Sequence, residues 1–452
     1  MRCTLARTSA FFAIISVVGC STPQSADRAT VDRGLFNRSG FHLKAESDPV
    51  DYGPLSDPNG LDESVAIDLA LANNAAFQEQ LAELGLSRAD VIQAGLIANP
   101  EFVMLFPIGP KQFEATATLP IEFLWLRERR IEAAQIASER TASRLAQAGV
   151  DLIRDVRLAY ADLALARRTR ELFEESAALR EQMATIAHAR VKAGEARALD
   201  AATAKIDAIR AQQEAKSLVF NTTIAEERLR ALMGASAIRT PIVTRNSMDA
   251  LNQDWNADAL VESALGDRSD IQAAQVAIDV AQERERLAWI DWFNMSIVGD
   301  VNQKGSKGWE TGPGIRFSLP IFNQNQGMIA RAAAEVQRLS LQKRTLQDQV
   351  NLEVRESYAR FAQARDDLNV WRAQILPALD EAVALSRKAY TGGETSLVQV
   401  IDMNRQLLEA HIREAKAASD LRRARAELER AVGRRLESKP LTPAAAPTEK
   451  AR

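Results

Sequence analysis

Two very long stretches of helix-forming sequence constrain this chain more than any other feature. Residues 122–191 and 326–390 are dominated by Ala, Leu, Arg, Glu and Gln, and the whole chain of 452 residues contains only 21 Gly and 15 Pro. A helix of about seventy residues is about 100 Å long, which far exceeds the diameter of a globular domain. We therefore expect two extended helices, the second bent or locally weakened by Pro377.

Each long helix follows a pair of short strand-like runs. The second run of each pair alternates apolar and polar residues, as expected of a strand with two different faces. The runs are 101–106 and 112–119 in the first half, and 294–301 and 312–319 in the second half. The strand-to-helix junctions, Thr118-Leu119-Pro120-Ile121 and Ser318-Leu319-Pro320-Ile321, are nearly identical and about two hundred residues apart.

The remaining helical sequence follows the same order in both halves. Helical patterns precede the strands at 61–98 and 258–290, and glycine-containing breaks at 192–197 and 392–393 follow the long helices. Shorter helices, 199–233 and 397–432, come next, and each is closed by a glycine. This order indicates an internal duplication.

An apolar seam with a seven-residue spacing runs along the second long helix. Its positions are Val354, Phe361, Leu368, Ile375, Ala382 and Ala389. A strict repeat of seven predicts left-handed coiled-coil packing. The intervening positions mix apolar and polar side chains, so an ordinary coiled coil or helical bundle is the alternative interpretation.

The first twenty residues have the features of a bacterial lipoprotein signal. Arg2 and Arg7 precede a short apolar run that is too short to span a bilayer, and Val17-Val18-Gly19-Cys20 resembles a lipobox. We predict that Cys20 becomes the lipidated first residue, and Ser21 favours sorting to the outer membrane. An ordinary secretory signal with a chance cysteine is the alternative.

These patterns divide the chain into five segments. Residues 1–19 are the signal peptide, and residues 20–60 are a lipidated N-terminal segment that is mostly irregular. Residues 61–250 form the first structural repeat, residues 251–437 form the second, and residues 438–452 form a disordered tail.

Composition excludes several functional classes. The net charge of −3, without a large basic region, argues against a nucleic-acid partner. Cys3 and Cys20 are the only cysteines, and the three histidines are far apart, so we expect no disulfide framework, no metal site and no cofactor. The sequence shows no nucleophile–base set and no phosphate loop, so we do not expect an enzyme.

Taken together, the duplicated strand pair and helical hairpin behind a lipobox resemble the TolC family of outer-membrane efflux proteins. The resemblance covers residues 61–437 and implies a mainly α fold with a small β part. In that family, three chains form one tube, in which four strands per chain build a barrel of about twelve strands. A long helical coiled-coil tunnel continues this barrel across the periplasm. Four strands cannot close a barrel alone, so the resemblance implies a homotrimer in the outer membrane lipid.

The two glycine breaks carry the sharpest local resemblance, because they look like the family's periplasmic tips. The resemblance implies that Ala193, Gly194, Glu195, Gly392, Gly393 and Glu394 contact a periplasmic adaptor (membrane fusion) protein. It also implies that Asp200 and Tyr390 link the closed gate and that Asp402 forms a carboxylate ring in the pore. Helix capping is the alternative role for both aspartates. Thr395 and Gln399 depart from the family's gate pattern, which puts its ion pair in question.

The segment from Gly312 to Gly327 looks like the outer-membrane lipoproteins of heavy-metal efflux systems of the cobalt–zinc–cadmium type. This resemblance implies a passive outer-membrane channel that extends into the periplasm, works with an inner-membrane pump of the RND type and exports metal cations. A channel for drugs or other small molecules and a structural coiled-coil envelope lipoprotein remain as alternatives. The coiled-coil lipoprotein would need no strands.

Overall fold

The computed structural model describes residues 24–44, 52–57, 59–106, 108, 112–245, 255–290, 295–303, 308–319 and 321–436. The predicted signal peptide, the lipobox with Cys20, Pro320 and the predicted tail lie outside these residues. The chain divides into two compact units, each assembled from distant parts of the sequence. One unit comprises Met1–Val31, Ala82–Ser143 and Ala273–Lys343, and the other comprises Asp32–Leu81, Arg144–Gln272 and Arg344–Arg452.

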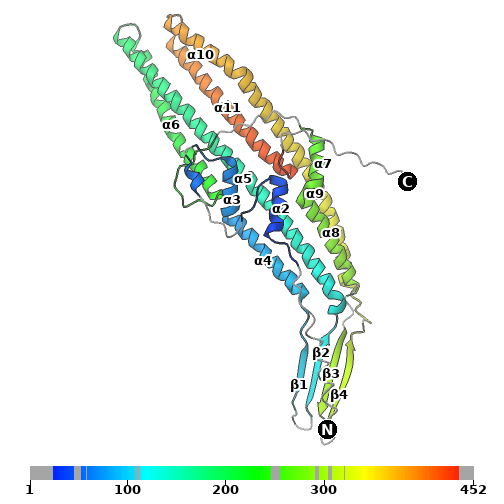
Figure 1. Cartoon of the computed structure of the whole chain (residues 1–452). Helices are drawn as coiled ribbons and strands as arrows, with labels where there is room; N and C mark the ends of the chain where they lie inside the picture. The colour runs from blue at the N-terminus through cyan, green and yellow to red at the C-terminus, as the bar shows by residue number, and fades with distance from the viewer. Residues whose placement is uncertain are drawn as a thin grey trace, which may run out of the picture. The chain divides into compact units, whose positions relative to one another are not determined.

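The first unit contains one antiparallel sheet with the strand order β1-β2-β3-β4. Figure 1 shows the four strands side by side: β1 (Glu101–Leu105), β2 (Glu114–Pro120), β3 (Met295–Gln303) and β4 (Trp309–Phe317). The strands pair in chain order, and the central pair joins strands from the two halves of the sequence. All four strands were predicted, with ends that differ by up to three residues.

The long helices end in two hairpins, which the second unit contains. In the first hairpin, α5 (Phe123–Lys192) runs for 70 residues without interruption and α6 (Ala198–Leu232) returns beside it. In the second hairpin, α9 (Gln326–Val370) leads through a π-helical turn, Trp371–Ile375, into α10 (Leu376–Thr391), and α11 (Leu397–Val432) returns. Both predicted hairpins are therefore confirmed.

The π-helical turn in the second hairpin lies just before Pro377. The Leu376 N–H donates to the carbonyl of Trp371, five residues earlier, instead of four. Pro377 has no N–H and its ring crowds the carbonyl one turn before it, so a regular α-helix is disfavoured at this point. The predicted weakening at Pro377 is confirmed as a local change of helix type.

This turn changes which residues face the core. Val354, Phe361 and Leu368 are buried as the seven-residue spacing predicted, but Ala382 and Ala389 are only half-buried. The buried residue beyond the turn is Val383, one position later. A π-helical turn contains one more residue than an α-helical turn, so it shifts the seam by one position. The predicted seam is therefore wrong beyond Ile375.

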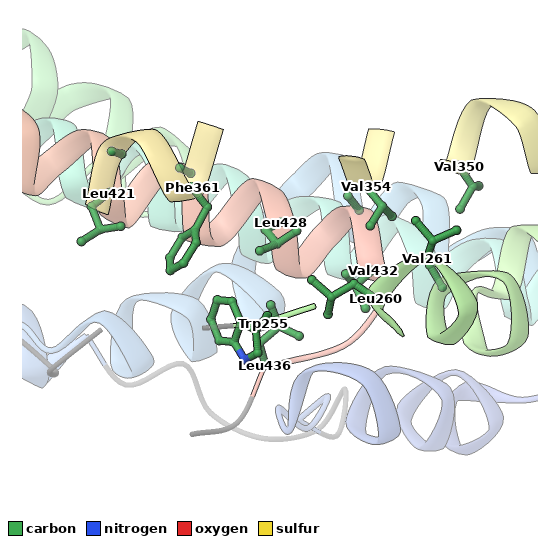
Figure 2. Close-up of a cluster of buried hydrophobic side chains, with 14 of the residues drawn as sticks. Trp255, Leu260, Val261, Val350, Val354, Phe361, Leu421, Leu428, Val432 and Leu436 are labelled. Carbon is green, nitrogen blue, oxygen red and sulfur yellow. The ribbon is translucent and has the colours of Figure 1, made fainter. Parts of the chain in front are cut away.

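A hydrophobic cluster packs the second hairpin at its end nearest the C-terminus. In Figure 2, Trp255 lies against Phe361, with ring centroids 4.9 Å apart. Side chains from α7 (Ala257–Asp267), α9 and α11 complete the cluster; among them are Leu260, Val261, Val350, Val354, Leu421, Leu428 and Val432. The apolar seam of α9 is thus covered by α11 and by the segment 255–271.

Two predicted helices are each divided in two. The helix predicted over 61–98 is α3 (Glu63–Asn73) and α4 (Ala75–Gly95), because Asn74 is extended and its side chain caps α4 through the Phe77 N–H at 3.0 Å. The helix predicted over 258–290 is α7 and α8 (Ser269–Ala288), separated at Arg268. The buried guanidinium of Arg268 donates to Glu353 at 2.9 Å and to the carbonyl of Ala431 at 3.0 Å.

The segment predicted as irregular also contains a helix, α2 (Arg28–Ser39). Its composition is poor for a helix, because it includes Gly34 and polar residues on all sides. Tertiary packing supports it instead. Leu35 is fully buried, and a Cβ at Gly149 of α5 would come within 2.9 Å of its side chain, so glycine makes room for this contact.

Candidate functional site

The two helical tips have the same backbone structure. At the first tip, the Glu195 N–H donates to Arg190 O at 2.9 Å and the Gly194 N–H donates to Val191 O at 3.0 Å. At the second tip, Glu394 and Gly393 make the matching bonds at 2.9 and 3.1 Å. Gly194 and Gly393 have φ of 77° and 79°, a conformation that favours glycine. Both tips therefore turn on a glycine in the left-handed conformation.

At the first tip, Asp200 caps the start of α6. Its carboxylate accepts the backbone N–H of Arg197 at 3.3 Å and the guanidinium of Arg197 at 3.1 and 3.2 Å. The side-chain hydrogen bond from Arg197 holds the pKa of Asp200 below its usual range. Capping, the alternative interpretation for Asp200, is confirmed within the chain. A gate contact for Asp200 stays a prediction.

At the second tip, a serine performs the capping. Ser396 Oγ accepts from the Gln399 N–H at 3.4 Å, and the Thr395 hydroxyl lies 2.5 Å from the Gln399 side-chain oxygen. Asp402 lies beyond this cap, is exposed and accepts from Gln406 at 2.8 Å. Ser396 and not Asp402 therefore caps α11, and Asp402 is a solvent-exposed carboxylate of this helix. Its place in a pore ring stays a prediction.

The two tips are packed against each other within the chain. Small side chains of α5 and α6 meet Leu397 of α11 in a cluster of buried residues, Ala184, Ala187, Ala204, Ala208 and Leu397. Tyr390 is partly buried beside this cluster, and the guanidinium of Arg190 lies 5.1 Å from its ring centroid. The sequence placed Arg190 at the first tip and assigned Tyr390 to the gate, but it did not pair the two residues, which are far apart in the sequence.

The sheet has one apolar face and one polar face. The registers bring Phe102, Ala117 and Gly299 opposite one another, and the same face continues along all four strands. Its apolar members are Phe102, Met104, Ala115, Ala117, Leu119, Met295, Ile297, Val301, Trp309, Pro313, Ile315 and Phe317. The large side chains among them, such as Phe102 and Ile315, are 67% and 68% exposed.

The other face of the sheet carries most of the polar side chains. Thr116 donates to Asp300 on the neighbouring strand at 3.2 Å, and Glu114, Asn302 and Glu310 are paired in one row. Val103, Leu105 and Val298 are its large apolar exceptions. A sheet that is apolar on one exposed face and polar on the other is suited to separate lipid from water.

Aromatic rings gather at the end of the sheet where β1 and β4 meet their loops. The ring of Phe113 lies 6.0 Å from that of Phe106 and 5.7 Å from that of Trp309, both in edge-to-face contact. Aromatic residues are enriched where a membrane protein meets the membrane–water interface. Sequence alternation indicated two-faced strands, but only the register shows that Phe102 of β1 and Ile297 of β3 share the face of Ile315.

The described residues also bear on two other kinds of site. They contain no group of three or more His, Cys, Asp or Glu side chains that could hold a metal ion. None of their helices combines the length and apolarity needed to cross a membrane.

Sequence comparison places these features in a known family. A family model described as outer membrane efflux protein matches residues 66–235 and 260–434. The cobalt-zinc-cadmium resistance protein CzcC of Cupriavidus metallidurans is 24% identical over 382 residues, covering 82% of this chain and 89% of that protein. The nickel-cobalt-cadmium resistance protein NccC of Alcaligenes xylosoxydans is 28% identical over 360 residues, covering 77% of this chain and 80% of that protein.

Solved structures share the fold. The structure of CusC, whose description concerns transmembrane channel formation, matches with a TM-score of 0.70 at 16% identity over 87% of this chain and 99% of that chain. The outer membrane protein VceC of Vibrio cholerae matches with a TM-score of 0.67 at 18% identity, over 83% and 97% of the two chains. The family match extends over well more than half of the sequence. The chain belongs to the outer membrane efflux protein family, and its predicted TolC-like fold is confirmed.

Proposed function

We propose that this outer membrane efflux protein is the passive exit channel of a tripartite exporter for metal cations. As a TolC-family channel it is not an enzyme, and it lies in the outer membrane and extends into the periplasm. In the proposal, three copies form the conduit. An inner-membrane pump of the RND type and a periplasmic adaptor deliver the substrate to it.

The two-faced sheet carries the proposal. Its strands of nine residues, β3 and β4, have the length needed to cross a bilayer when tilted. Its large apolar side chains are exposed in the single chain, which is costly in water and favourable against lipid. Four strands are too few to close a barrel, because about eight are needed to enclose a filled interior. Three chains would supply enough strands and would place the polar face toward the lumen.

Adjacent residues of β3 allow a matched test of this arrangement. Ile297 lies on the apolar face and Val298 on the polar face of the same strand. Ile297→Arg should place a charge in lipid at a cost of about 2–4 kcal/mol per chain near the bilayer centre, whereas Val298→Arg should face water. We expect Ile297→Arg to reduce the amount of trimer in outer-membrane fractions, measured by native mass spectrometry, and Val298→Arg to retain it. Equal losses in both variants would contradict the two-faced barrel.

Metal cations are proposed as the substrate from the relatives. CzcC and NccC are named for resistance to cobalt, zinc, nickel and cadmium, and the chain covers most of both proteins. The test is to express the protein in cells that lack their own channel of this type, with and without the matching pump and adaptor, and to measure the resistance of these cells. Restored resistance to divalent metals supports the proposal. Restored resistance to drugs alone would favour the other small-molecule channel.

The lipid anchor is part of the proposal. Cys20 lies outside the described residues, and its lipobox is the supporting feature. Two acyl chains on its thiol, with a third on the new N-terminus, would hold the protein firmly in the membrane. Mass spectrometry of the N-terminal peptide should show a lipidated Cys20. An unmodified cysteine, or a mature chain that begins elsewhere, would overturn this part of the proposal.

Asp402 is proposed as the pore carboxylate. Three copies around the threefold axis would attract cations and would make conductance depend on pH and on divalent ions. Asp402→Ala should lower cation selectivity in planar bilayers. Glu409→Ala is the control, because Glu409 is also an exposed carboxylate on α11 but pairs with Arg413 at 2.6 Å. Unchanged selectivity in Asp402→Ala would place Asp402 outside the lumen.

A further inference from the structure

A small cavity lies among α2, α5 and the C-terminal end of α11, within the second unit. Its volume is about 20 Å³, which suffices for one ligand of the size of a water molecule or a halide ion. Residues from all three helices line it, and the backbone joins its walls, since the Arg435 N–H donates to Arg38 O at 2.6 Å. The proposed channel function uses none of these residues.

Six arginines and one glutamate line the cavity. The arginines come from all three walls: Arg38, Arg154, Arg157, Arg430, Arg434 and Arg435. The glutamate is Glu429, which is 5% exposed. Arg435 is exposed and the other five arginines are half-buried. Half-buried guanidinium groups require acceptors or counter-charges, because their desolvation is costly.

Neighbouring carboxylates compensate three of these arginines. Arg154 pairs with Asp155 at 2.6 Å, and Arg430 pairs with Asp151 at 2.9 Å. Arg157 pairs with Glu429 and also with Glu63 at 3.1 Å. These carboxylates are therefore committed to cations that they contact directly.

The other three arginines have weaker compensation. Arg434 comes only to 3.9 Å of Asp267. Among the described residues, neither Arg38 nor Arg435 has a carboxylate within ion-pair distance. Burial lowers the pKa of Arg38, and the more distant carboxylates of Asp270 and Asp267 offset this only in part. Positive charge is in excess around the cavity.

Buried donors in the cavity wall also lack acceptors. Arg38 Nη1 and Arg434 Nε are each shielded from solvent and make no hydrogen bond. A buried donor without an acceptor costs about 1–3 kcal/mol, and more when it is charged, so native structures supply a partner for such groups. Two such donors, one on α2 and one just beyond the end of α11, therefore lack an acceptor, and a single acceptor in the cavity would satisfy both.

We propose that this cavity binds a small monovalent anion, with chloride as its natural ligand, and that the anion ties α2 to α5 and α11. A halide accepts several N–H donors at once and neutralises the excess charge. Water would accept hydrogen bonds but would leave the charge unbalanced. Phosphate or sulfate would need a larger space than about 20 Å³.

Thermal unfolding of the full-length protein in detergent tests the proposal. At constant ionic strength, replacing gluconate by chloride should raise Tm by roughly 2 °C for each tenfold increase above the dissociation constant. Arg38→Gln should remove this dependence. Arg423→Gln should retain it, because Arg423 is also an arginine of α11 but pairs with Asp162 at 3.1 Å and does not line the cavity. A parent protein whose Tm is the same in chloride and gluconate would overturn the proposal.

Bromide supplies a second measurement that does not depend on a variant. Crystals of the parent protein soaked in bromide should give an anomalous peak in the cavity, near Arg38 and Arg434. A cavity with no peak, filled by water alone, would overturn the proposal even if Arg38→Gln failed to fold. Equal loss of the chloride effect in Arg38→Gln and Arg423→Gln would also overturn it, because the effect would then be general screening.

Discussion

The long helix of the first hairpin is regular throughout, whereas the corresponding helical stretch of the second hairpin contains one additional residue. The two hairpins share a local sequence, Val156-Arg157 with Tyr160 in α5 and Val354-Arg355 with Tyr358 in α9, at a separation of 198 residues. The tip glycines Gly194 and Gly393 are separated by 199 residues. The separation therefore grows by one residue between the tyrosines and the tip glycines, so the second hairpin holds its extra residue in that interval. The π-helical turn Trp371–Ile375 is the irregularity there.

This difference shows how a duplicated helix can accept an insertion. An extra residue in a continuous α-helix would rotate every later side chain by about 100°. The π-helical turn absorbs the extra residue within five positions, so Val383 and Tyr390 still face the core. The tips keep the same hydrogen bonds in both hairpins as a result.

The largest expected effect comes from deleting a single residue from one of the long helical stretches. Deleting the exposed Gln374 in a Pro377→Ala background should restore a continuous helix and change the free energy of unfolding by less than about 1 kcal/mol. Deleting the exposed Glu175 in α5 should rotate Ala177, Ala184 and Ala187 away from their partners and cost more than about 4 kcal/mol. Circular dichroism during denaturant unfolding measures both. Similar costs for the two deletions would contradict the register explanation.

The next effect separates the two equivalent tyrosines. Tyr160 is buried, and its hydroxyl lies 2.7 Å from Leu61 O and 2.9 Å from Arg245 O, so it donates to one of them. Tyr160→Phe should cost about 1–3 kcal/mol, because a buried acceptor loses its donor. Tyr358 is only partly buried beside the cluster at Trp255, so Tyr358→Phe should cost less. The two variants are compared by their denaturation midpoints, and a larger loss in Tyr358→Phe would contradict this assignment.

The same tyrosine predicts a difference at alkaline pH. Burial raises the pKa of Tyr160 from 10.0 to about 12. The native state therefore holds this proton more tightly than the unfolded state, so the contribution is complete below pH 10 and is lost as the pH rises toward 12. The parent should lose more stability than Tyr160→Phe across that interval. Parallel pH profiles would show that Tyr160 titrates normally.

The smallest effect concerns the glycines of the second tip. Gly393 has φ of 79° and Gly392 has φ of −75°, and neither position would place a Cβ in a steric clash. Gly393→Ala should cost about 1–2 kcal/mol, because an alanine disfavours the left-handed conformation. Gly392→Ala should be neutral or slightly stabilising. Thermal unfolding of the two variants provides the comparison, and adaptor binding should follow the same order.

Much of the fold could be predicted because its signals are local. Pro120 beside an alternating strand, the glycines at 194 and 393, and Pro377 each act on a few neighbouring residues, and the structure has a strand end, two helix caps and a π-helical turn at these places. The register of the seam beyond Ile375 could not be predicted. No local signal in the sequence states that one turn holds an additional residue.

The candidate site divides in the same way. The sequence indicated Asp200, Tyr390 and Asp402 near the tips, and the structure shows which neighbours each contacts. The sequence could not indicate that Arg190 lies over Tyr390, or that Arg38 and Arg434 line one cavity, because the residues of each pair come from distant parts of the chain.

The sequence by itself determined the duplicated order of helices and strands, because hydrophobic periodicity, proline and glycine restrict the backbone locally. The tertiary structure decided where α3 and α4 divide, which helix α2 packs against, and which side chains share the apolar face of the sheet. These features depend on contacts between residues far apart in the chain. Their free energy comes from burial and pairing in three dimensions, which a one-dimensional pattern does not contain.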